Sequence, residues 1–74
     1  MTRMSMWTVY DHPRDYPNNY VAREWIVENG KERPGTNIIL APDLDKLREV
    51  LRRGLFHPIP RSEGDDPVIV ETWI

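Results

Sequence analysis

The last stretch of the chain, residues 67–74, constrains the fold most, because its pattern predicts a buried β-strand. It is rich in β-branched and aromatic residues, carries proline only at its first position and follows an acidic turn cluster at 63–66. A buried strand needs neighbouring strands and a second layer over at least one face. The rest of the chain must therefore supply both.

Two earlier stretches supply candidate partner strands. Residues 5–10 have strand composition, and the strand must end before Pro13, because proline cannot donate to a β-ladder. Residues 20–27 alternate imperfectly between apolar and polar positions. We predict that these two strands pair antiparallel across a loop rich in proline and asparagine.

The segment from 29 to 37 is predicted to be a mobile connection. Asn29-Gly30 is a strong hairpin signal, but residues 31–35 form a poor strand sequence. Residues 38–40 (Ile-Ile-Leu) form either a short edge strand or a plug of the core, since periodicity does not separate the two in so short a run. Residues 1–4 are expected to be disordered.

Residues 43–54 carry the pattern of an amphipathic helix. Its apolar stripe consists of Leu44, Leu47, Val50 and Leu51. Asp43 is a natural N-cap, because its carboxylate can accept a backbone N–H of the first turn, and Gly54 is a natural stop. Leu55 and Phe56 are expected to tuck under the sheet.

These elements predict a single domain over residues 1–74 with an α+β fold. The expected architecture is a two-layer sandwich of strand, strand, helix, strand (ββαβ) order, with one helix packed on one face of a small, mainly antiparallel sheet. The last strand is predicted to be central, because its apolar density is the highest.

Both faces of the predicted sheet carry apolar residues. The first strand has Met4, Met6 and Tyr10 on one side and Trp7 and Val9 on the other; the last has Val68, Val70 and Ile74 against Ile69 and Trp73. One helix covers only one face, so either loops cover the second face or it meets another molecule. A homodimer and a protein partner are both open, and strand addition at a sheet edge is a second route to a dimer.

Composition excludes several classes of protein. The chain has no cysteine, which excludes disulfides and thiolate metal sites. Its formal charge of −2 disfavours nucleic-acid binding. No apolar run approaches the roughly 20 residues that span a bilayer, so no membrane association is predicted. We expect a cytoplasmic protein.

The loop at 11–17 is the densest cluster of functional groups. His12 can titrate near neutral pH, Arg14 can bind an anion through two hydrogen bonds, and Tyr16 adds a hydroxyl. We predict a small-ligand or anion site from these three residues, with Trp25 and His57 at its rim. The alternative is that Asp11 and Asp15 cap turns, Tyr16 packs and Arg14 pairs with an acid.

No catalytic residue, metal site or cofactor is predicted. His12 and His57 lack the close spacing of a metal motif, and the chain has neither a phosphate-binding glycine loop nor a serine in a nucleophile elbow. A non-enzymatic protein is therefore expected. Base stacking by exposed aromatic residues leaves single-stranded nucleic-acid binding as a third hypothesis.

Several stretches carry a resemblance to a known family. They are WTVYDHP at 7–13, YP at 16–17, YVAREW at 20–25 and DDPVIVETW at 65–73, together with the helix at 44–51. The chain resembles a family of small bacterial proteins without an assigned activity. The resemblance implies a bacterial, cytoplasmic protein and implies no functional residue. The leading prediction is therefore association through the sheet, with itself or with another protein.

Overall fold

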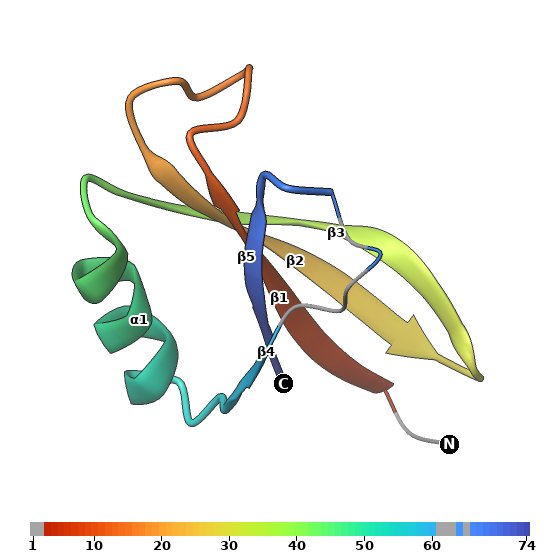
Figure 1. Cartoon of the computed structure of the whole chain (residues 1–74). Helices are drawn as coiled ribbons and strands as arrows, with labels where there is room; N and C mark the ends of the chain where they lie inside the picture. The colour runs from red at the N-terminus through yellow and green to blue at the C-terminus, as the bar shows by residue number, and fades with distance from the viewer. Residues whose placement is uncertain (1–2, 61–63, 65) are drawn as a thin grey trace.

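A computed structural model describes residues 3–60, 64 and 66–74 (Figure 1). Its elements are β1 (Arg3–Asp11), β2 (Tyr20–Glu28), β3 (Lys31–Ala41), α1 (Leu44–Arg53), β4 (Pro58–Pro60) and β5 (Ile69–Trp73). The strands form one antiparallel sheet in the order β3-β2-β1-β5-β4. Helix α1 lies on one face, toward one end of the sheet, and the β2–β3 hairpin extends away from it (Figure 1).

The predicted ββαβ order is wrong, although the broader α+β class holds. The described chain runs β-β-β-α-β-β, because the predicted connection at 29–37 and the segment after the helix both contribute strands. β3 takes in most of the predicted mobile connection at 29–37, and β4 is the extended segment before residue 61. The central strand is β1, whereas the last strand, β5, lies between β1 and β4. Residues 3 and 4, predicted to be disordered, begin β1; residues 1–2 lie outside the described residues.

The turn chemistry at Asn29-Gly30 explains why β3 forms. Both residues have positive φ, 55° and 75°, as a two-residue type I′ hairpin requires. The turn sets Glu28 opposite Lys31, so the following residues are aligned along the free edge of β2. Pro34 is tolerated because β3 is itself an edge strand. The hairpin signal therefore outweighs the poor strand composition.

Two β-bulges re-aim side chains in the sheet. Arg23 pairs with Ile38 and Trp25 with Pro34, so residues 35–37 all lie opposite Glu24. The second bulge is in β5, where Val9 pairs with Glu71 but Tyr10 pairs with Ile69. Val70 is the extra residue, and Ile69 therefore turns to the face opposite Trp73, against the predicted alternation.

The core lies between α1 and the sheet. Its buried residues are Trp7, Val9, Ala22, Ala41, Leu47, Leu51 and Trp73. The predicted helix is confirmed, with Asp43 as N-cap: its carboxylate accepts a hydrogen bond from the backbone N–H of Lys46. Phe56 packs against the core as expected, but Leu55 is wrongly predicted, since 82% of its surface is exposed.

The exposure of Leu55 follows from how the helix ends. The backbone N–H of Leu55 donates to Arg52 O at 2.9 Å, and that of Phe56 donates to Leu51 O at 3.2 Å. This pair of bonds is a Schellman motif, in which the residue after the C-cap takes a left-handed conformation. That residue is Leu55, with φ 66°, whereas the C-cap Gly54 has φ −80°. The turn directs Phe56 inward and Leu55 into solvent.

Candidate functional site

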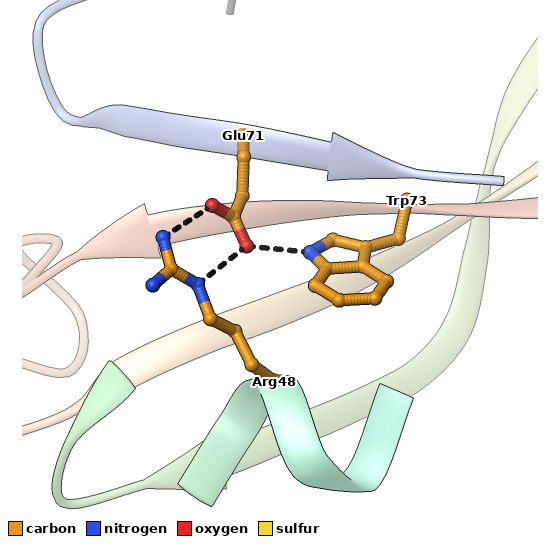
Figure 2. Close-up of polar contacts among 3 residues, drawn as sticks. All are labelled: Arg48, Glu71 and Trp73. Carbon is orange, nitrogen blue, oxygen red and sulfur yellow. Dashed lines mark hydrogen bonds and ion pairs between the residues drawn. The ribbon is translucent and has the colours of Figure 1, made fainter. Parts of the chain in front are cut away.

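The buried carboxylate of Glu71 ties the helix to the sheet (Figure 2). Arg48 donates to it twice, from Nε at 3.1 Å and from an Nη at 2.7 Å, and Trp73 Nε1 donates at 2.6 Å. Burial alone would raise the pKa of Glu71, but the hydrogen bonds from Arg48 and Trp73 outweigh it and lower that pKa. Since three donors of the protein itself hold this carboxylate between the helix and the sheet, we assign Glu71 a structural role.

The predicted loop site is held together by local contacts. His12 has φ 48°, its Nδ1 pairs with the carboxylate of Asp11, and its ring meets that of Tyr20 edge-on at 4.9 Å. Its backbone N–H donates to Asn19 O at 3.0 Å. Arg14 is exposed and makes no ion pair with any described residue.

Tyr16, the third loop residue, turns toward Arg23 in β2. The Arg23 guanidinium lies 6.0 Å from the ring centroid of Tyr16 and 5.7 Å from that of Tyr10, and it forms an ion pair with Asp15. The loop therefore folds back over one end of the sheet and neutralises Arg23 there.

Trp25 and His57 do not lie at the rim of this loop. Trp25 is opposite Met6, five residues beyond the start of β2 at Tyr20, or roughly 17 Å along the strand. His57 exchanges backbone hydrogen bonds with Ile74, at the end of β5 remote from the loop. The predicted set of site residues is thus divided among three places.

The sheet face opposite α1 is the second apolar face expected from the sequence. Strand register assigns to it Met4, Met6, Thr8, Tyr10, Val21, Arg23, Trp25, Val27, Glu32, Pro34, Ile38, Leu40, Ile59, Ile69 and Thr72, which we call the open face. At the loop end Val21 is fully buried, but Ile38, Leu40 and Ile59 remain 38%, 44% and 41% exposed. The loop therefore covers Val21 at one end of this face, and the apolar side chains of the two edge strands stay exposed.

The open face is hollowed beside the β2–β3 bulge. A pocket of about 260 Å³ there has Arg23, Trp25, Pro34 and Ile38 among its lining residues. An aromatic residue beside a concave, mainly apolar surface is typical of the centre of a protein interface. Trp25, predicted at a ligand rim, thus lines a pocket on the open face.

A polar cleft on the helix side of the same bulge was missed by sequence reasoning. It has a volume of about 410 Å³ and is lined by Arg3, Met4, Ser5, Glu24, Ile26, Arg33, Gly35, Thr36 and Asn37. The signal that could have found it is Gly35 within a strand, since an isolated glycine there indicates a bulge. Because residues 29–37 were predicted to be a mobile connection, Gly35 was not expected to lie within a strand.

Comparisons with known proteins found no relative of this chain. Family models, curated proteins and solved structures were all searched, and none matches this chain. The resemblance to a small bacterial family therefore stays a prediction. No helix within the described residues is long and apolar enough to cross a membrane, and those residues hold no group of three or more His, Asp or Glu side chains that could bind a metal.

Proposed function

We propose that this protein acts by self-association, as a homodimer that buries the open face of its sheet. The observation that carries the proposal is the exposure of Ile38, Leu40 and Ile59 on a face that α1 leaves uncovered. Ile38 and Leu40 lie on β3 and Ile59 on β4, the two edge strands, and exposed apolar side chains gathered on one face commonly mark an interaction surface.

The open face suits a second copy in both size and charge. The molecule measures 38 × 28 × 22 Å. A molecule of this size is large enough for one of its faces to bury the ~800 Å² that each partner buries in a standard interface. By strand register its charged residues are Arg23, with which Asp15 already pairs, and Glu32 near the hairpin end of β3. A nearly uncharged surface does not select a charged partner, and it can meet its own copy without repulsion.

The sheet edges support association through the face rather than by strand addition. β4 is three residues long and has proline at both ends, so two of its backbone nitrogens cannot donate. At the other edge, β3 carries charged residues and a proline along its first half. These are features with which proteins protect sheet edges from pairing.

Light scattering over a concentration series tests the proposal. The wild type is expected at twice the monomer mass at high concentration. Leu40→Lys should shift it to monomer, because a desolvated ammonium at the interface is costly. Val50→Lys is the matched control, since Val50 is 47% exposed on α1, away from the open face. A strict monomer for the wild type, or equal effects of both variants, would overturn the proposal.

Anion binding at the loop is a second candidate function. The observation in its favour is Arg14, whose guanidinium is exposed and forms no ion pair within the described part of the chain. Phosphate is expected to move the amide resonances of His12 and Arg14, and Arg14→Gln should abolish the shift while Arg53→Gln preserves it. Unmoved resonances would eliminate this candidate.

A further inference from the structure

The polar cleft on the helix side of the β2–β3 bulge is built around Glu24. Ser5 Oγ donates to one carboxylate oxygen at 3.0 Å, and Asn37 Nδ2 donates to the other at 3.0 Å. The three residues come from β1, β2 and β3, so the sheet itself fixes the carboxylate. An ionised carboxylate offers about four acceptor positions, so each oxygen can still accept another donor.

The bulge brings backbone against this carboxylate at one glycine. A Cβ at Gly35 would lie 2.6 Å from Glu24 Oε1 and 3.1 Å from the Glu24 backbone oxygen. Any other residue would therefore push the carboxylate away from Ser5 and Asn37. Bulges that re-aim a side chain are over-represented beside functional sites.

Helix α1 leaves this end of the sheet uncovered. Its buried residues pack on Trp7, Val9, Ala22 and Ala41. Glu24 lies opposite Trp7 at the limit of this core, and Ser5 and Ile26 continue the same face beyond it. The hairpin end of β2 and β3 lies away from the helix in Figure 1. The cleft therefore opens to solvent over a floor of one fixed carboxylate and the apolar Ile26.

Two arginines add positive charge to a cleft that already holds the negative charge of Glu24. Arg3 from β1 and Arg33 from β3 line it, and neither forms an ion pair with any residue that the structure describes. A carboxylate at the base disfavours a simple anion, and two guanidinium groups disfavour a simple cation. A ligand that carries both charges satisfies both sets of groups.

We propose that this cleft binds a small zwitterion, with a primary ammonium on Glu24 and a carboxylate against Arg3 and Arg33. A free α-amino acid is the simplest such ligand. The compact ammonium has three donors for the remaining acceptors of Glu24, and guanidinium groups bind carboxylates through paired hydrogen bonds. The cleft shares the bulge residues Glu24, Gly35, Thr36 and Asn37 with the pocket beside Trp25. By strand register, however, Arg3, Glu24 and Arg33 belong to the face opposite the dimer surface, so the assignment does not need the dimer.

An NMR titration with L-leucine, methylamine and acetate tests each half of the site. L-Leucine should move the amide resonances of Ser5, Gly35 and Asn37. Glu24→Gln should weaken L-leucine binding by roughly ten- to hundredfold, the size expected for losing a hydrogen bond to a charged group. The same variant should abolish the response to methylamine and keep that to acetate.

Arg33→Gln should give the reverse pattern, losing acetate and keeping methylamine. Arg33 is exposed, so this variant tests the site without threatening the fold. Glu49→Gln and Arg53→Gln are matched controls, because these residues form an exposed ion pair on α1. Unmoved cleft resonances with L-leucine, or equal weakening by Glu24→Gln and Glu49→Gln, would overturn the assignment. Either result leaves the dimer test unaffected.

Discussion

At the scale of single residues, Glu71 is a carboxylate largely removed from water. Its side chain is 10% exposed and accepts three hydrogen bonds, two of them from an arginine. Such a carboxylate stabilises the fold only while it is ionised, because protonation removes the charge that Arg48 and Trp73 bind. The folded state of this protein therefore depends on the pH.

Acid should weaken the protein through Glu71. Its pKa is lower in the folded state than its ordinary value of 4.5, so its contribution is complete above pH 4.5 and is lost as the pH falls through the folded pKa. Glu71→Gln should reduce the free energy of unfolding at pH 7 by about 2 kcal/mol and flatten its acid dependence. Urea unfolding between acidic and neutral pH measures both. An unchanged acid slope in the variant would contradict this role.

Leu55 has a left-handed backbone conformation that glycine would adopt without strain. A left-handed conformation costs a residue with a Cβ about 1–2 kcal/mol, and the exposed Leu55 side chain contributes little packing in return. Leu55→Gly should therefore stabilise the protein by about 1 kcal/mol, or roughly 4–8 °C in Tm. Leu55→Ala is the control, since it removes the same side chain but keeps the Cβ. A lower Tm for Leu55→Gly than for Leu55→Ala would refute the argument.

At the scale of elements, the β2–β3 hairpin depends on both its turn and its bulge. The turn at Asn29-Gly30 begins the pairing, and the bulge opposite Glu24 then changes the register before Ile38. The distal half of the hairpin reaches beyond α1, so its stability depends on strand pairing and on the hydrogen bonds of Glu24.

Gly35→Ala should destabilise this hairpin by about 1–2 kcal/mol. The new methyl would displace the Glu24 carboxylate from Ser5 and Asn37. Much of the clash is with the Glu24 side chain, so Gly35→Ala should cost less in a Glu24→Ala background. A thermal-unfolding double-mutant cycle measures that coupling. Strictly additive effects would show that the close approach of Gly35 and Glu24 does not matter.

At the scale of the whole molecule, one short helix covers part of one sheet face. A chain of 74 residues buries only about 60% of the surface that its unfolded form exposes, so a large uncovered apolar face is costly for the monomer. Dimerisation through the open face would remove that surface from water.

Stability should therefore depend on protein concentration. A dimer is stabilised by mass action, so the Tm of the wild type should rise as concentration rises. The Tm of Leu40→Lys should be independent of concentration, whereas Val50→Lys should behave as the wild type does. Calorimetry over a hundredfold range of concentration makes the comparison. A constant wild-type Tm would contradict dimerisation.

Local chemistry made the helix, its N-cap Asp43, the first two strands and the apolar second face predictable. Each depends on residues close in sequence: a spacing of three and four, a capping carboxylate, or an alternation of two. The left-handed turn at Asn29-Gly30 is local as well. The lesson from residues 31–37 is that a strong turn can align a segment of poor strand composition.

Tertiary structure alone decided the order of the strands, the pairing of β3 with β2 and of β4 with β5, and the places of the site residues. An edge strand is stabilised by hydrogen bonds to a neighbour remote in sequence, which its own composition does not encode. The two bulges changed which side chains share a face, so simple alternation misplaced Ile69. For the same reason, Ser5, Glu24 and Asn37 share a cleft while the predicted His12, Trp25 and His57 lie apart. Register, which is a property of paired strands, determined both outcomes.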